Sequence, residues 1–179
     1  MHAQHQDETL RRFFAGIAEQ TFQVQLGVVD PPVTDYVSEL LLRFVRTEDI
    51  HRVRRTDGRP VRDLGQMVLE ADSRIGTARR RIHRQIGDFA LFWAGLFPES
   101  LGHHSADATE QPYGAFCVHG QRAYLIASEI DTDEQGETPN DVLERIGRQF
   151  QMCAYGLREV RREWERSEGD KDARPFLIN

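Results

Sequence analysis

The sequence predicts an all-α protein, a single-domain bundle of about five or six helices. Apolar residues recur every three or four positions along most of the chain, as they do on the buried face of an α-helix. Helix-capping residues stand where several of these stripes begin and end. The length of 179 residues suits one domain. We therefore interpret residues 1–179 as one helical domain, with flexible ends expected at residues 1–7 and 168–179.

The first two helices are the best defined by local signals. One is predicted from about Glu8 to Leu26, and Gly27 is a natural stop. Asp30 is positioned to cap the next helix, with Pro31 as its first residue. The short connection predicts that the two helices pack as an antiparallel hairpin. The apolar stripe of the second helix consists of Val33, Tyr36, Val37, Leu40, Leu41, Phe44 and Val45.

A polar stretch over residues 46–59 ends in an Asp-Gly turn signal and is predicted to be a loop. A helical pattern then extends from Pro60 to Phe97, where a proline follows and stops it. This run is long for one helix of a bundle, so we expect a break between Ser73 and Gly76. From residue 86 onward almost every position is apolar, which predicts the central helix of the bundle.

The C-terminal half is predicted to contain two further helices. A polar loop over residues 101–112 precedes a helical pattern over residues 113–127. An acidic loop over residues 131–137 then leads to the last helix. Thr138 is the expected cap of that helix, Pro139 its first residue, and an aspartate three positions after the threonine completes a capping box.

Composition and targeting signals favour a soluble, cytoplasmic protein. No apolar stretch approaches the roughly 18 residues of a membrane-spanning helix. The N-terminus lacks the basic and apolar regions of a signal peptide. Cys117 and Cys153 are the only cysteines, too few for a disulfide framework, and both lie within apolar helical patterns. Buried free thiols are expected.

Asp88 is the first candidate for a functional residue, because it follows Gly87 in the most apolar helix. A carboxylate there is costly unless it is paired or hydrogen-bonded. The favoured interpretation is structural, as a buried Asp–Arg pair or a cap at a helix break. The alternative is a ligand-facing or proton-transferring carboxylate with a raised pKa. Gly87 and Gly95 share a helix face and permit the close approach of a backbone or a ligand, helix packing being the commoner reason.

Positive charge is concentrated in one segment. Residues 51–84 contain ten arginines and four acidic residues, so this segment carries +6 while the rest of the chain carries −12. Such a layout suits an anionic partner, whether nucleic acid, an acidic protein or another copy of the chain. The favoured alternative is that the arginines form the solvated side of a helix. The candidate patch consists of Arg79, Arg80, Arg81 and Arg84.

Motifs for metal or nucleophilic chemistry are weak. The available groups are Glu48 with His51, the pair His103-His104, and Cys117 with His119. Two residues apart on a helix, Cys117 and His119 point in nearly opposite directions. Neither a Gly-x-Ser-x-Gly elbow nor a phosphate-binding Gly-x-x-x-x-Gly-Lys loop is present. No cofactor is predicted, although a metal, or a haem held by a single histidine, stays an open alternative.

The segment Gln85–Glu99 contains a Gly-Asp…Leu-Phe…Gly…Phe-Pro pattern, and Tyr113-Gly114 and residues 120–124 follow downstream. In these features the chain resembles a set of uncharacterised bacterial all-helical proteins. The resemblance implies a helical fold. It also implies that Asp88 and the tyrosine-bearing helix face one another.

Three functions are compatible with these features. The favoured one is a non-enzymatic helical bundle that acts through protein contacts as a homo-oligomer. The first alternative is a bundle that binds a small molecule or cofactor close to Asp88. The second is nucleic-acid binding through the arginine-rich segment 51–84. The candidate ligand-binding residues of the first alternative are Asp88, Tyr113, His119, Arg122 and Tyr124.

Overall fold

A computed structural model describes residues 2–45, 64–103 and 112–169, all of them helical or in short connections without strands. The all-α class is confirmed, but the described residues form seven α-helices where five or six were predicted. A π-helical turn (Gln20–Gln25) continues the first helix, and a 3-10 helix (Pro98–His103) follows the fourth. The α-helices are α1 (His2–Glu19), α2 (Pro31–Val45), α3 (Leu64–Asp72), α4 (Gly76–Leu96), α5 (Pro112–Ser128), α6 (Asn140–Arg148) and α7 (Phe150–Gly169).

The extra helix arises because the last predicted helix is divided at Gln149. This residue leaves the helical conformation, with φ −107° and ψ 24°, and its N–H donates to the carbonyl of Arg145. The helix resumes at Phe150, which is buried in the core. Neither proline nor glycine stands at the break itself, so the local sequence did not predict it.

The predicted capping box at Thr138 is also wrong. Helix α6 begins at Asn140, and no side chain caps its first turn. The Thr138 carbonyl instead accepts a hydrogen bond from Arg80, and its hydroxyl lies 3.5 Å from Arg84 Nη1. Asp141, the expected partner of the box, pairs with Arg145 over 2.8 Å. Arginines therefore take both groups that the box would have used.

The N-terminal signals are confirmed more closely. Asp30 Oδ1 accepts a hydrogen bond from the N–H of Val33 at 3.3 Å, as an N-cap residue does. Gly27, after the π-helical turn, has a φ of +67° that side-chain-bearing residues rarely adopt. Helices α1 and α2 pack together and are joined by the ion pair of Arg11 with Glu39. Helix α1 starts earlier than predicted, because extending a helix costs little once it is nucleated.

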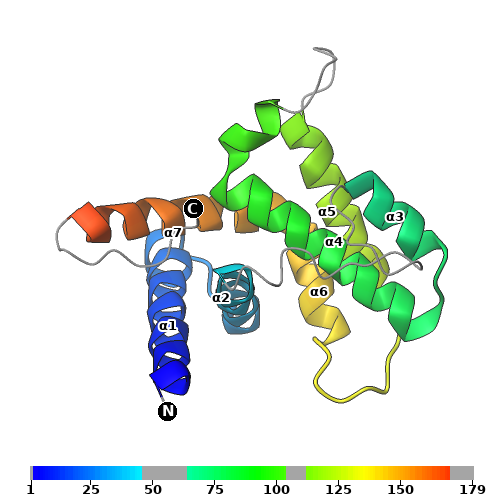
Figure 1. The fold of residues 1–179 in the computed structure, drawn as a ribbon, viewed down its shortest axis with the longest axis horizontal. Coiled ribbons are helices and arrows are strands. Elements are labelled where there is room, and N and C mark those ends of the chain that lie inside the picture. Colours follow the sequence, from blue (N-terminus) through cyan, green and yellow to red (C-terminus); the bar gives the residue numbers. More distant parts are fainter. Residues whose placement is uncertain (1, 46–63, 104–111, 170–179) are drawn as a thin grey trace.

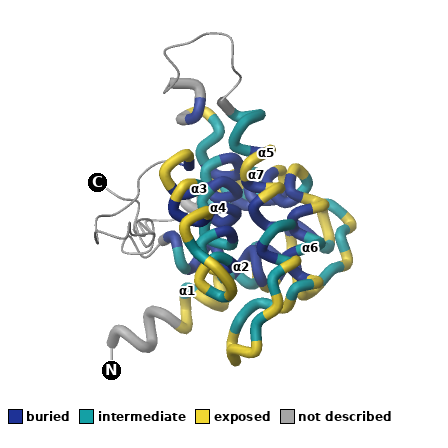
Figure 2. The backbone as a smooth tube through the Cα atoms, turned by 90° about the vertical axis from the view of Figure 1, so that its right-hand side faces the viewer, coloured by how far each residue is buried: buried dark blue, intermediate teal, exposed yellow. Residues whose placement is uncertain are grey.

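Helix α4 is the centre of the arrangement, as predicted. It packs against α2, α3, α5 and α7, and its second half is almost entirely buried. Figure 1 shows α4 running beside α5 and α3, with α1 and α2 on the other side of the molecule. Buried segments of different helices meet in the interior in Figure 2. The expected break between Ser73 and Gly76 is confirmed by the end of α3 and the start of α4.

Two glycines allow other helices to approach α4 closely. A Cβ atom on Gly87 would lie 2.8 Å from ring carbons of Tyr124, and one on Gly95 would lie 2.6 Å from Cβ of Leu157. Gly87 thus lets α5 pack closely against α4, and Gly95 does the same for α7. The predicted loop over residues 46–59, the helix start at Pro60 and most of the loop over residues 101–112 lie outside the described residues. No described helix is both long enough and apolar enough to span a membrane.

Candidate functional site

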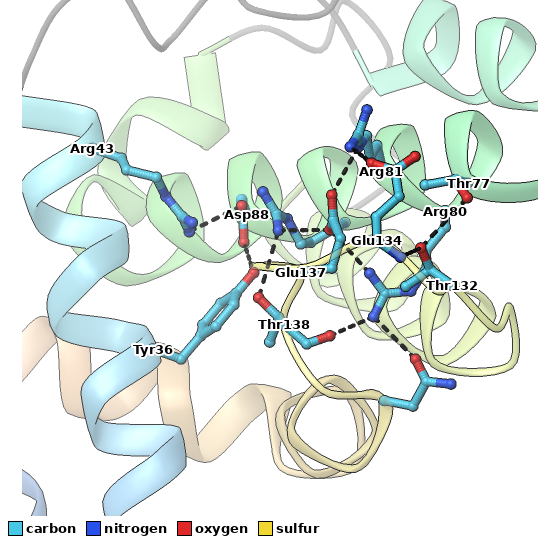
Figure 3. Close-up of polar contacts among 12 residues, drawn as sticks. Tyr36, Arg43, Thr77, Arg80, Arg81, Asp88, Thr132, Glu134, Glu137 and Thr138 are labelled. Carbon is cyan, nitrogen blue, oxygen red and sulfur yellow. Dashed lines mark hydrogen bonds and ion pairs between the residues drawn. The ribbon is translucent and has the colours of Figure 1, made fainter.

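Asp88 lies in the middle of α4, where only 5% of its surface is exposed. Its Oδ1 accepts hydrogen bonds from the phenol of Tyr36 and, at 2.7 Å, from the phenol of Tyr124. Its Oδ2 accepts a hydrogen bond from Arg43 Nη2 at 3.1 Å. Figure 3 shows the contacts from Tyr36 and Arg43. We call these four residues the Asp88 cluster.

Three helices position the Asp88 cluster. Tyr36 and Arg43 are seven residues apart on α2, so two helical turns bring them to the same face. The Arg43 guanidinium lies 5.3 Å from the centre of the Tyr36 ring. Tyr124 reaches in from α5, and its ring meets that of Tyr36 edge to face at 6.1 Å. The cluster therefore joins α2, α4 and α5 in the core.

The electrostatics of the Asp88 cluster keep its phenols protonated and its arginine charged. Burial, followed by the Asp88 charge, raises the pKa of both Tyr36 and Tyr124 above 10.0. Burial alone would lower the pKa of Arg43, but the charge of Asp88 and the contributions of Tyr36 and Tyr124 together outweigh it and raise that pKa. The Asp88 carboxylate thus accepts hydrogen bonds from two neutral phenols and one cation. This is the arrangement that a buried charge needs to be tolerated.

A second set of charges lies one to two turns earlier on α4. Three guanidinium groups converge on the carboxylate of Glu137: Arg80 Nη1 at 3.1 Å, Arg81 Nε at 2.7 Å and Arg84 Nη1 at 3.2 Å. Arg81 also pairs with Glu134. The Arg80 side chain is only 1% exposed. Figure 3 shows Arg80, Arg81 and Glu137 among the polar contacts at this end of α4. We call these five residues the Glu137 cluster.

The carboxyl of Glu137 is held in its charged form. Burial acts to raise its pKa, but the hydrogen bond from Arg81 and the charges of Arg84, Arg81 and Arg80 outweigh this effect. The pKa therefore lies below its ordinary value. The Asp88 and Glu137 clusters adjoin, because Arg84 and Asp88 are four residues apart on α4 and so lie on one face. The charge of Arg84 also acts on the phenol of Tyr36.

The other candidate ligand-binding residues do not join the Asp88 cluster. Tyr113 accepts a hydrogen bond from Arg158 Nη2 at 3.1 Å. His119 and Arg122 are exposed on α5. The structure thus brings together two members of the predicted set, Asp88 and Tyr124, in the relation that the family resemblance implied. Arg79, from the predicted arginine patch, lies 4.0 Å from Asp72.

Several weaker predictions concern possible metal ligands. Cys117 and Cys153 are buried free thiols, as expected, and burial together with the charge of Asp30 raises the pKa of Cys153 to about 12. Glu48, His51 and His104 lie outside the described residues. Within the described ranges, no three or more histidine, cysteine or acidic side chains are grouped as metal ligands would be.

The sequence does not identify Tyr36, Arg43 and Glu137 as members of these clusters. Tyr36 stands in an apolar stripe, which predicts a core residue. Arg43 lies on the same helix face seven residues later, and this spacing was the available signal. Glu137 belongs to the acidic loop. The sequence shows that this loop and the arginines of α4 carry opposite charges, but it does not show which residues pair.

A surface groove of about 630 Å3 lies where α6 meets α7. Its apolar residues come from the connection before α2 and from the start of α7, and its amides come from α5, the helix break and α7. Exposed apolar residues stand close to its lining in the sequence: Val29 is 82% exposed, Val118 62% and Tyr155 47%. The lining residues are Val28, Gln121, Arg148, Gln149, Phe150, Gln151 and Met152.

No protein-family model matches the chain, and searches of curated proteins and of solved structures found no match.

Proposed function

We propose that the protein is a non-enzymatic helical module that acts through protein contacts, and that its contact surface is the groove at the α6–α7 junction. The observation that carries this proposal is the combination of apolar and amide side chains in the lining of the groove. Val28 and Met152, both half-buried, supply the apolar part, whereas the Phe150 side chain is only 1% exposed. Glutamine side chains both donate and accept hydrogen bonds, so they suit the main chain of a docked protein segment.

The surroundings of the groove support a protein contact. Val118 is one helical turn before Gln121 on α5, and Tyr155 is one turn after Gln151 on α7. Exposed apolar side chains therefore stand one helical turn from the groove lining, and exposed apolar surface is typical of interaction sites. The groove thus belongs to a larger surface that a partner can cover.

We propose a second copy of this chain as the partner, because the chain carries complementary charge. Arg122 is exposed beside Gln121, and Arg148, in the lining, is 71% exposed at its side chain while it pairs with Glu144 over 2.6 Å. The connection between α5 and α6 exposes Asp131 and Asp133. An acidic loop of one copy can therefore face the basic rim of another.

The alternative functions have less support. Each Asp88 oxygen already accepts hydrogen bonds from within the chain, so a small-molecule site there would first have to displace them. The arginines of α4 that would contact nucleic acid are paired with Glu134 and Glu137.

Sedimentation velocity of the purified full chain over a range of concentrations tests this function. We expect reversible dimer formation, and we expect Met152→Glu to weaken it by roughly tenfold or more, because a charge would enter the apolar part of the lining. Leu69→Glu is the matched control, since Leu69 is 71% exposed on α3 and does not line the groove. A chain that stays monomeric at every concentration, or equal weakening by both variants, would refute the proposal.

A further inference from the structure

We propose that Arg80, Arg81 and Arg84 form a binding site for a phosphate monoester group, and that Glu137 occupies this site as an internal ligand. The site would therefore be closed by the chain's own acidic loop. A phosphorylated ligand and Glu137 would compete for the same three guanidinium groups.

The positive charge of three arginines converges on one carboxylate. Donors from all three arginines lie 2.7–3.2 Å from the two oxygens of a single carboxylate. Glu134 adds one further negative charge. Three cations therefore face two anions, and one unit of positive charge is left over. A dianionic phosphate in place of Glu137 would balance the site with Glu134 still present.

Two buried N–H donors of the arginines also lack an acceptor. In the part of the chain that the structure describes, Nε of Arg80 and Nε of Arg84 are buried without a hydrogen-bond acceptor. Such orphaned groups are costly and call for an explanation. A carboxylate offers two oxygens, whereas a phosphate monoester offers three strong acceptor oxygens and suits the planar fork of arginine. A phosphate thus has more acceptors than the group now in the site.

The internal ligand, Glu137, belongs to the loop that connects α5 to α6. Residues 131–138 join α5 to α6, and Figure 1 shows them as a loop beyond the ends of the neighbouring helices. Asp133, Glu134 and Gln135 are exposed, and Gly136 turns the chain with a φ of +83°. Displacement of Glu137 would disturb this loop while leaving the apolar core in place.

The number of arginines at one anion favours a monoester over a nucleic acid. Polymer binding would spread guanidinium groups along successive phosphodiesters, each with a single negative charge. Here the three guanidinium groups converge on one carboxylate. Removal of the Glu137 charge should therefore reveal a site for one small dianion.

Titration calorimetry with inorganic phosphate on the full chain tests the competition. Glu137→Gln keeps the shape of the internal ligand and removes its charge, so we expect it to bind phosphate roughly tenfold or more tightly than the unsubstituted chain. Glu163→Gln is the matched control, because it removes a carboxylate from the surface pair with Arg166. The double variant Glu137→Gln/Arg81→Gln should lose this increase in phosphate affinity. Equal phosphate affinity in Glu137→Gln and Glu163→Gln would overturn the proposal.

If Glu137→Gln does not fold, a measurement on the unsubstituted chain tests the phosphate site instead. Hydrogen–deuterium exchange of residues 131–138 should become faster as inorganic phosphate displaces Glu137, with exchange in α7 unchanged. A phosphodiester oligonucleotide at the same phosphate concentration should have a smaller effect. Exchange in residues 131–138 that does not respond to phosphate, or that responds more strongly to the oligonucleotide, would refute the monoester site.

Discussion

The phenol of Tyr124 donates a hydrogen bond to Asp88 over 2.7 Å, and this contact ties α5 to the centre of α4. Tyr124 is fully buried, and its ring packs on Gly87, the residue before Asp88. Gly87 thus makes room for the Tyr124 ring, and Asp88 accepts a hydrogen bond from its hydroxyl.

Replacement of Asp88 by alanine should lower the free energy of unfolding by about 3–5 kcal/mol, because two buried phenols and Arg43 would lose their acceptor. Urea unfolding followed by circular dichroism measures this loss. Asp88→Asn keeps the shape but removes the charge, and should also destabilise because Arg43 stays partly buried. Unchanged or increased stability in Asp88→Ala would contradict a structural role and favour a functional carboxylate.

The two tyrosines of the Asp88 cluster should be energetically coupled. Tyr36→Phe and Tyr124→Phe each remove one donor to the same oxygen, and each should cost about 1 kcal/mol. The double variant should cost a different amount from the sum, because the remaining phenol can respond to the loss of its neighbour. A double-mutant cycle from urea unfolding gives the coupling. Strict additivity would show that the two hydrogen bonds act independently.

The core face of α2 provides a test of packing. Phe44 stacks on Phe92 of α4 with ring centres 4.2 Å apart, and it is 6% exposed. Phe44→Ala should therefore cost about 3–5 kcal/mol. Phe13→Ala, at a residue 39% exposed on α1, should cost less in the same unfolding experiment. Similar losses at both positions would show that α2 contributes no more to the core than the surface of α1.

The features that the sequence predicted well are those set by neighbouring residues. The apolar stripe of α2, the stop at Gly27 and the Asp30 cap depend on contacts within a few positions. The burial of residues 86–96 of α4 was visible as a run of apolar residues. The break at Gln149 was not predictable in this way, because no helix-breaking residue marks it.

The composition of the two polar clusters was less accessible. The partners of Asp88 lie 36 to 52 residues away along the chain, and those of Glu137 lie 53 to 57 residues away. A buried aspartate predicts that a partner exists, since an unpaired charge would be costly. It does not predict which of the many arginines is that partner. The acidic loop and the arginines of α4 were each recognised, but their pairing depends on the folded arrangement of α4 and α6.

Acid should destabilise the protein partly through Glu137. The pKa of this carboxyl is lowered on folding, so its contribution to stability is present above its ordinary value of 4.5. The contribution should be lost as the pH falls below 4.5 and through the lowered pKa. Urea unfolding at a series of acidic pH values should show a shallower loss for Glu137→Gln than for Glu163→Gln. Identical slopes in the two variants would contradict this assignment.

Alkali should destabilise the protein through Tyr36 and Tyr124. Both phenols have a pKa raised above 10.0 by burial and by the charge of Asp88. As the pH rises past 10.0, the unfolded chain releases protons that the folded chain retains, so the free energy of unfolding falls. The double variant Tyr36→Phe/Tyr124→Phe should reduce this slope, whereas Tyr155→Phe, on the exposed face of α7, should not. Phenolate absorbance should rise together with the loss of helical circular dichroism, because ionisation of the two buried phenols accompanies unfolding. Full ionisation of every tyrosine while the helices remain intact would contradict the burial of the Asp88 cluster.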